Sequence, residues 1–320
     1  MPAGIKVFRG LSVKDDPLVI NPQSTPDCSN ILTSDPIGAL VNMEGIEKYN
    51  SVGFGAAIVA IHQLNGHIFS LAGSKLYEGY PAVPPEGYTA ITDCAGLQAM
   101  QDNLAGKYYL ANDIDCTYCT QDPAGALYNA GAGFEPVGTI ATPFTGVFDG
   151  NGYTITGLKI NRPATNYIGL FGVCRNVEIK NVGMINVDTS GNDDVGSLVG
   201  LNRNDNTVTN CYATGAVSGV GGIGGGTGGL VGRNYSSSIM TNCYSTCVVS
   251  GNPYIGGLVG RNNSGVYADC FWDTETSGQA TSAGGTGKTT AQMKQEATFE
   301  NWDFATIWVI VEDTSYPTLR

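Results

Sequence analysis

The sequence contains few charged residues and only two histidines. Of its 320 residues, 14% are charged, and the small number of Lys and Arg leaves a net charge of -12. Because affinity for a phosphate backbone comes mostly from clustered Lys and Arg, this balance argues against nucleic acid as a partner. The pair His62 and His67 does not form the His-Glu-x-x-His pattern of zinc peptidases. We therefore expect no metal and no cofactor.

Long apolar segments are also missing. No stretch approaches the roughly 18 consecutive apolar residues of a membrane-spanning helix, so we expect no membrane span. The first ten residues, 1–10, lack the apolar centre of a secretory signal peptide. On this basis the sequence predicts a protein that is made in the cytoplasm and is not secreted.

The sequence does contain two short phrases that are repeated. A phrase close to Gly-Gly-Leu-Val-Gly-Arg-Asn occurs three times between residues 195 and 262, with its leucines at Leu198, Leu230 and Leu258. A second phrase, Thr-Asn-Cys-Tyr, follows at 209–212 and 241–244 and returns in altered form at 268–271. Both phrases are short, rich in Val, Cys, Tyr and Thr, and bounded by turn residues, which is typical of strands.

A repeat of about 28 residues with two or three short strands cannot bury a core alone, so it needs similar neighbours above and below. Stacked coils that pair in parallel about 4.8 Å apart satisfy this need. The sequence therefore predicts an all-β fold, a right-handed parallel β-helix (solenoid). The second repeat is four residues longer, and we assign the excess to a loop in the glycine-rich segment 219–228.

Equivalent side chains are expected to stack from coil to coil. Alternation along the second phrase points its cysteines inward, which predicts buried free thiols rather than disulfides at Cys211, Cys243 and Cys270. The asparagines that end the first phrase predict a structural ladder at a turn, with left-handed backbone and amide-to-amide hydrogen bonds, at Asn202, Asn234 and Asn262.

Two sets of residues are candidates for binding. If the cysteines point inward, an aromatic stripe points outward at Tyr212, Tyr244 and Phe271. Such a stripe favours packing between coils, and stacking on a glycan is the alternative. The neighbours of the asparagine ladder, Arg233 and Arg261, favour a solvated surface, with an acidic sugar as the alternative ligand.

Three patterns are close to those of metal or redox sites, phosphate-binding loops and catalytic carboxylate pairs, but none of them is sufficient to predict such a site. The spacing of Cys116 and Cys119 suits a redox or zinc site, but no second pair follows. The segment 282–289 is close to a phosphate-binding loop but lacks the strand before it and the apolar helix after it. Paired carboxylates could cleave polysaccharide, although most of the available ones favour turns: Asp188, Asp193, Asp194, Asp205, Asp269 and Asp273. We predict no catalytic residues.

The two phrases resemble the GLUG motif, a repeat found in bacterial surface proteins, in some peptidases outside their catalytic part, and in phage-encoded proteins. The resemblance covers about residues 88–320, with an entry helix near 97–104. It implies a β-helix over 89–275 and a C-terminal cap at 276–320, with a helix from about Thr290 and a strand at 308–311. It specifies the fold and implies no particular chemistry.

Residues 1–79 carry a second resemblance, to the opening of tail and tail-associated proteins of tailed bacteriophages, on the segments 11–22, 38–49 and 72–77. This resemblance implies a small β-rich module that docks on other virion proteins. A hairpin is predicted with its turn at Asn65-Gly66. The proline-rich segment 80–88 is predicted to be a stiff linker.

Together these features predict a structural protein of a phage virion. The N-terminal module would dock on the particle, and the β-helix would project for attachment to a host-surface polysaccharide or for decoration, without catalysis. Family analogy implies a homotrimer. Two alternatives remain: a bacterial cell-surface adhesin with GLUG repeats, and a tailspike-like polysaccharide depolymerase.

Overall fold

The computed structural model describes residues 86–320 except 223 and 252, and upstream of them only the backbone of five strands. The chain divides into two compact units, Met1–Val83 and Pro84–Arg320. In the first unit β1 (Leu11–Lys14) and β2 (Asp16–Ile20) form an antiparallel pair, and a second antiparallel sheet contains β3 (Val59–Leu64), β4 (His67–Ala72) and β5 (Lys75–Gly79).

The hairpin predicted in the first unit is confirmed, because Leu64 of β3 lies opposite His67 of β4. The docking role predicted for residues 1–79 depends on side chains that lie outside the described residues. Most of the predicted linker at 80–88 lies outside them as well.

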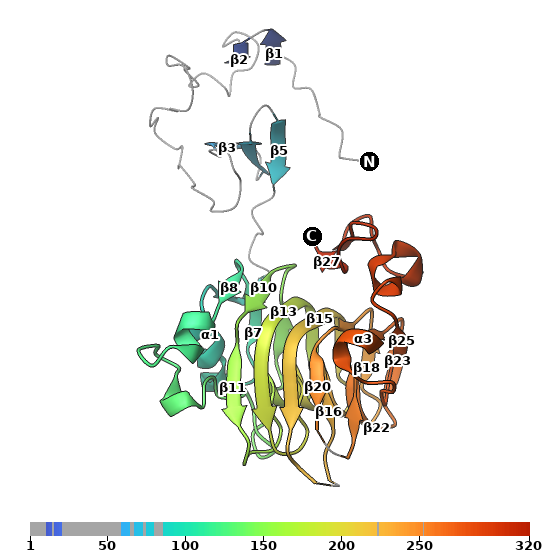
Figure 1. The fold of residues 1–320 in the computed structure, drawn as a ribbon. Helices are drawn as coiled ribbons and strands as arrows, with labels where there is room; N and C mark the ends of the chain where they lie inside the picture. The colour runs from blue at the N-terminus through green and yellow to red at the C-terminus, as the bar shows by residue number, and fades with distance from the viewer. Residues whose placement is uncertain are drawn as a thin grey trace. The chain divides into compact units, whose positions relative to one another are not determined.

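The second unit is a parallel β-helix, as predicted (Figure 1). Its first sheet contains fourteen strands, all paired in parallel: β6 (Thr89–Ile91), β7 (Lys107–Leu110), β8 (Ile114–Asp115), β9 (Val147–Asp149), β10 (Thr154–Thr156), β11 (Lys159–Arg162), β13 (Glu178–Gly191), β15 (Thr207–Gly219), β18 (Ile239–Thr241), β19 (Tyr244–Ser245), β20 (Val248–Ser250), β23 (Val266–Ala268), β24 (Phe271–Asp273) and β25 (Thr286–Lys288).

Two smaller parallel sheets close the coils. One contains β12 (Phe171–Arg175), β14 (Val199–Arg203), β17 (Val231–Tyr235) and β22 (Val259–Asn263), and the other contains β16 (Thr227–Gly228) and β21 (Ile255–Gly256). Short helices flank the solenoid: α1 (Cys94–Ala99), η2 (Met100–Asp102), α2 (Thr117–Gln121), η3 (Asn129–Gly131) and α3 (Thr274–Ser277). The predicted entry helix therefore begins a few residues earlier than expected.

The core includes the cysteines that were predicted to point inward. The repeat leucines and cysteines are buried and belong to one continuous cluster: Leu198, Leu230, Leu258, Cys211, Cys243 and Cys270. All three of these cysteines are free thiols. Burial raises the pKa of the Cys243 thiol well above its ordinary value. The repeat cysteines therefore act as small buried apolar side chains.

The predicted asparagine ladder lies in strands and not at a turn. The predicted ladder residues Asn202, Asn234 and Asn262 lie inside β14, β17 and β22, in register with one another. Their amides form one rung, from Asn202 Nδ2 to Asn234 Oδ1 at 2.8 Å. The prediction of left-handed backbone at these three residues is wrong, because each continues an extended strand.

At the corners, left-handed backbone occurs at the residue immediately before the inward-pointing residue of each coil. Four residues with φ near +50° occupy this position, and in order along the chain they are Asn181, Asn210, Asn242 and Asp269. Asn and Asp tolerate this conformation better than other residues that carry a side chain. In the first pair the amide of Asn210 donates to Asn181 Oδ1 at 3.0 Å. These corners let β13 and β15 bend round the core without losing their pairing.

The C-terminal segment, residues 289–320, is called the strap below. It contains two short 3-10 turns, η4 (Gln292–Lys294) and η5 (Glu296–Thr298), and an antiparallel pair, β26 (Trp308–Val309) with β27 (Thr318–Leu319). The helix predicted from Thr290 is therefore replaced by short turns. The strap lies along one side of the solenoid, in dark red in Figure 1, with β27 in contact with β13.

Candidate binding groove

The predicted aromatic stripe does point away from the cysteine core. Tyr212 on β15, Tyr244 on β19 and Phe271 on β24 are in register across successive coils. The Tyr212 and Tyr244 rings stack with centroids 5.1 Å apart and planes 6° apart. These three side chains belong to a second hydrophobic cluster, separate from the solenoid core. They form the aromatic column of the solenoid.

The strap covers this column. Trp308 lies with its ring centroid 6.0 Å from that of Tyr212 and 6.3 Å from that of Tyr244. The Tyr244 hydroxyl donates to the Pro317 carbonyl at 2.6 Å. As a result Tyr212 and Tyr244 are only 2% and 1% exposed. The packing between coils that the sequence favoured is therefore present, and the alternative of an open stripe for glycan stacking is contradicted at Tyr212 and Tyr244, because the strap buries both rings.

A buried carboxylate fastens the strap at its two ends. Asp273 is the last residue of β24, and its Oδ1 accepts from the amides of Glu275 and Thr276 at the start of α3. Its Oδ2 accepts from Thr290 Oγ1 and from Tyr316 Oη, both at 2.7 Å. Burial and the neighbouring Asp273 carboxylate raise the pKa of the Tyr316 hydroxyl. Asp273 therefore has a structural role.

An open groove of about 520 Å³ lies where the strap leaves the last coil. Its wall on the coil side contains an aromatic ring, a carboxylate, a hydroxyl and an amine: Phe271, Asp269, Thr286 and Lys288. Its wall on the strap side contains two amides, a hydroxyl and a carboxylate: Gln292, Gln295, Thr298 and Glu300. The lining is therefore mostly polar, because the Phe271 side chain is only 8% exposed.

Of the five residues predicted to bind a ligand, only Phe271 lines this groove. The amine of Lys288 lies 5.8 Å from the Phe271 ring centroid. Lys288 belongs to β25, so the segment that resembles a phosphate-binding loop is a further rung of the solenoid. The Ser282 hydroxyl accepts from the Val259 amide at 2.9 Å, which fixes that segment to the coil below.

The two predicted arginines make intramolecular contacts on the glycine-rich loop. Arg233 Nε donates to Asp194 Oδ1 at 2.9 Å, and its guanidinium also donates to the Gly224 carbonyl. Arg261 Nη1 donates to the same carbonyl at 2.9 Å, and Arg261 Cζ lies 4.8 Å from the Tyr254 ring centroid. These contacts hold the longer loop of the second repeat against the solenoid, in contrast to the solvated surface predicted for them.

Asp194 is the most perturbed carboxylate of the unit. Its side chain is 1% exposed, and its Oδ1 also accepts from the Gly226 amide at 2.9 Å. Burial raises the pKa of Asp194 from 3.8 to about 6, although Arg233 and the Gly226 amide act in the opposite direction. Asp194 is thus an ion-pair partner of Arg233 that anchors the loop.

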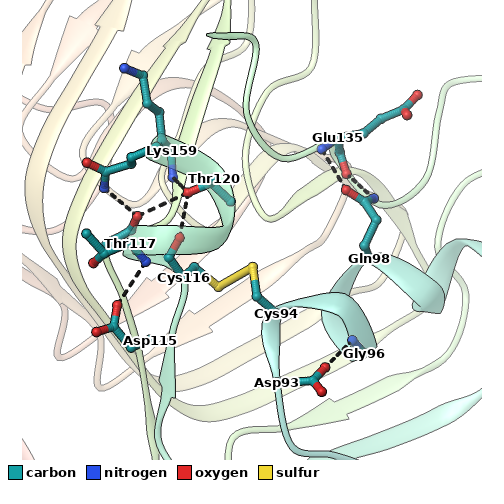
Figure 2. Close-up of a disulfide and its surroundings, with 12 residues drawn as sticks. Asp93, Cys94, Gly96, Gln98, Asp115, Cys116, Thr117, Thr120, Glu135 and Lys159 are labelled. Carbon is teal, nitrogen blue, oxygen red and sulfur yellow. Dashed lines mark hydrogen bonds between the residues drawn. A yellow bond between two sulfur atoms is a disulfide. The ribbon is translucent and has the colours of Figure 1, made fainter. Parts of the chain in front are cut away.

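A disulfide joins Cys94 and Cys116 and was not predicted (Figure 2). It connects the first residue of α1 to the residue before α2, with the Cα atoms 5.4 Å apart. Figure 2 shows the side chains that fix these two helices, including Asp93, whose Oδ1 accepts from the Gly96 amide at 2.7 Å. Cys119, the second cysteine of the pair whose spacing suits a redox or zinc site, is a half-buried free thiol.

The part of the chain that the structure describes has no cluster of three or more His, Cys, Asp or Glu arranged to hold a metal ion. Within the same residues, no helix is both long and apolar enough to cross a membrane.

Comparison with protein families finds the GLUG motif at residues 191–218, from the end of β13 through most of β15. Among curated proteins, the chain is similar to halomucin from Haloquadratum walsbyi, with 37% identity over 143 residues, and to a "Putative Gly-rich membrane protein" from Evansella cellulosilytica, with 39% identity over 109 residues. An immunoglobulin A1 protease from Streptococcus sanguinis is 29% identical over 133 residues.

These matches cover 43%, 33% and 40% of this chain. The chain spans only 2%, 12% and 6% of the length of the same relatives. Among solved structures, a crystal structure titled as a putative immunoglobulin A1 protease from Bacteroides ovatus matches with a TM-score of 0.42 and 17% identity. The match covers 72% of this chain and 92% of that one.

Proposed function

We propose that this chain is a segment of a cell-surface adhesin, in which the β-solenoid is a rigid, non-catalytic module that presents a binding surface. The observation that carries this proposal is the set of relatives. The chain matches small parts of much longer proteins, one of which is named a membrane protein and another a protease of an antibody. A repeat module within a long surface protein accounts for such short matches.

The disulfide supports the same location. Disulfides form and persist in oxidising environments, which include the cell exterior, and are rare in the cytosol. The bridge between Cys94 and Cys116 lies at the first coil of the solenoid, where β6 is the edge strand of the sheet among the described residues. It would stabilise the end of a solenoid that must persist outside the cell.

Catalysis is not part of the proposal. Two of the carboxylates considered for polysaccharide cleavage have structural partners, because Asp194 is paired with Arg233 and Asp273 fastens the strap. The protease name belongs to a relative of which this chain matches 6%. The adhesin alternative therefore replaces the depolymerase alternative as the better account.

The virion interpretation stays a prediction. It rests on residues 1–79, whose side chains lie outside the described residues, and the relatives named above do not include a phage protein. Docking on virion proteins, a homotrimer and a virion location are likewise predictions from the sequence alone. Co-purification of the chain with phage particles would restore this interpretation.

The location can be tested by treating intact cells that express the native gene with trypsin. We expect peptides from residues 86–320 to be released from intact cells. Because Lys107 lies between Cys94 and Cys116, the two cysteines fall on different tryptic peptides, and we expect these to remain linked without reduction. Peptides that appear only after lysis, with both cysteines open to thiol labelling, would contradict the proposal.

A further inference from the structure

We infer that three side chains on the outer face of the solenoid form a binding site for an acidic sugar. The three are Arg175 on β12, Arg203 on β14 and Tyr235 on β17, which are paired in register from coil to coil and are called the arginine column below. Such a site would give the surface module proposed above its ligand class, and its biological setting rests on that proposal.

The side chains of the arginine column point away from the solenoid core. The residue before each of them is buried, in order along the chain Cys174, Asn202 and Asn234. Because successive side chains of a strand point to opposite faces, the residues that follow are on the outer face. Arg175 is exposed, Arg203 is half-buried, and Tyr235 is 41% exposed. A ligand in solvent can therefore reach all three.

The two arginines of the column differ from the other cations of residues 86–320. The lysines there each lie near a carboxylate or over an aromatic ring. The other arginines donate to carbonyls or to a carboxylate, namely Arg162, Arg233, Arg261 and Arg320. Within the described residues no such partner contacts the guanidinium of Arg175 or Arg203, and Arg203 Nε is shielded from solvent without an acceptor.

Two unpaired cations in register are unfavourable for the fold. Their strands are neighbours about 4.8 Å apart, and like charges that lie directly opposite each other destabilise a sheet. Asp205, two residues after Arg203, is exposed and forms no ion pair with it. Glu178, three residues after Arg175, is paired with Lys180 at 2.7 Å. An anion that bridges the two guanidinium groups would relieve this repulsion.

Tyr235 continues the column and favours a ligand that contains a ring. No aromatic ring or cation among the described residues stacks on it, in contrast to Tyr244, which the strap covers. An exposed tyrosine offers an apolar face and a hydroxyl, which suit the C–H face and the hydroxyls of a pyranose. One coil of about 4.8 Å separates Tyr235 from Arg203. One sugar can therefore rest on the ring while its anionic group reaches the guanidinium.

The local charge at the column decides the class of sugar. The whole chain carries a net charge of -12, but exposed charges more than about 10 Å away are largely screened at about 0.1 M salt. A guanidinium binds a carboxylate or a sulfate through two parallel hydrogen bonds. A neutral sugar would leave both arginines without an anion. The site therefore commits to sugars that carry a carboxylate or a sulfate group.

Titrations of the full chain followed by nitrogen-15 NMR test the site. The acidic probes are methyl glucuronide and glucose 6-sulfate. Methyl glucoside has the ring without the charge, whereas glutamate and inorganic sulfate have the charge without the ring. We expect at least one acidic sugar to shift the amides of Arg203 and Tyr235 at concentrations up to about 50 mM, and to bind at least about fivefold more tightly than the other three probes.

Two results of these titrations would overturn the inference. One is that neither acidic sugar shifts the two amides. The other is that methyl glucoside, glutamate or inorganic sulfate binds as tightly as the better acidic sugar, because the site would then recognise only a ring or only an anion.

The variant Arg203→Gln tests the role of the charge. Glutamine retains a polar side chain but has no charge, and loss of a charge-assisted hydrogen bond is expected to weaken binding of the acidic sugar about tenfold. Arg175→Gln is expected to weaken it about threefold to tenfold, because this side chain is more exposed. Tyr235→Ala should have an effect of similar size through loss of the ring. Native affinity in Arg203→Gln would contradict the inference.

The matched control is Lys159→Gln, which removes one positive charge from the larger sheet. The Lys159 amine lies 3.8 Å from Asp188 Oδ2 and belongs to β11, outside the column. We expect this control to bind the acidic sugar as the native chain does. An equal loss in Lys159→Gln and Arg203→Gln would show that only the overall charge matters, which would also overturn the inference.

Urea unfolding separates a binding role from a structural one. Because the two arginines repel each other, we expect Arg175→Gln to leave the urea midpoint unchanged or to raise it. A lower midpoint would show that the fold requires this charge, contrary to the inference. Failure of sugar binding would leave the surface-location test unaffected, and failure of that test would leave the binding data standing.

Discussion

Replacement of Trp308 with alanine is expected to lower the free energy of unfolding by about 3–5 kcal/mol. Trp308 lies in β26 of the strap, and none of its side chain is exposed. Its ring centroid is 4.2 Å from that of Trp302 and within 6.3 Å of those of Tyr212 and Tyr244. Removal of the indole would leave a large cavity between the strap and the solenoid.

Urea unfolding followed by circular dichroism measures this loss. The matched control is Val311→Ala, in the same strap but at a side chain that is 58% exposed. We expect the control to change the free energy of unfolding by no more than about 0.5 kcal/mol. If the two variants lose equally little, the strap does not depend on its contact with the aromatic column.

Replacement of Arg233 with methionine is expected to destabilise the fold by about 3–5 kcal/mol at pH 8, because it leaves the Asp194 carboxylate buried without its partner. The Asp194 side chain is 1% exposed, and that of Arg233 is 21% exposed. Methionine retains an unbranched apolar side chain in place of the arginine stem. The loss of the hydrogen bond from the guanidinium to the Gly224 carbonyl adds to the effect.

The effect of Arg233→Met should depend on pH in a defined direction. In the native chain the pKa of Asp194 is raised from 3.8 to about 6 by burial. The folded state therefore keeps the proton at pH values where the unfolded state has lost it, so stability from this group falls between about pH 4 and pH 6. Without Arg233 the pKa of Asp194 rises further, and the decrease in stability with rising pH therefore continues to higher pH. The loss caused by Arg233→Met should therefore be smaller at pH 5 than at pH 8 by up to about 2.7 kcal/mol, because pH 8 lies two units above the native pKa and each unit is worth about 1.36 kcal/mol. The part that comes from the lost hydrogen bond to the Gly224 carbonyl should remain at both pH values.

Denaturant titrations of both proteins at these two pH values test the direction. The control is Asp194→Asn, a change that suits the left-handed backbone at this position, where φ is 54°. In the Asp194→Asn background, Arg233→Met should lower the free energy of unfolding by much less than it does in the native chain. This smaller loss should not depend on pH between 5 and 8. An equal loss from Arg233→Met at both pH values in the native background would show that the carboxylate is not what the arginine stabilises.

The repeat spacing allowed the solenoid to be predicted from the sequence. Leucines that recur after 32 and 28 residues within one repeated phrase indicate equivalent environments, and stacking in parallel is how short strands provide them. Alternation around Cys211 correctly placed the thiols inside and the rings outside. The left-handed corner was assigned to Asn202, whereas it lies at Asn210. Both asparagines recur once per coil, so periodicity alone does not distinguish a strand position from a corner.

The strap and the disulfide could not be predicted in the same way. Alternation shows which way Tyr244 points but not what covers it, and the segment that covers it lies 45 or more residues further along the chain. A signal was present, since the strap is rich in large aromatic residues such as Trp302 and Trp308. Cys94 and Cys116 lie outside the repeats, so they had no periodic partner that could indicate their environment.

The strap is part of the folded unit, where it buries the aromatic column and forms one wall of the groove. Hydrogen–deuterium exchange of the full chain, followed by mass spectrometry, can test this arrangement. We expect peptides that contain Trp308 and Thr318 to exchange as slowly as peptides from β13 and β15. Exchange of the strap at the rate of an unstructured chain, with the solenoid still protected, would contradict the claim and leave the aromatic column open.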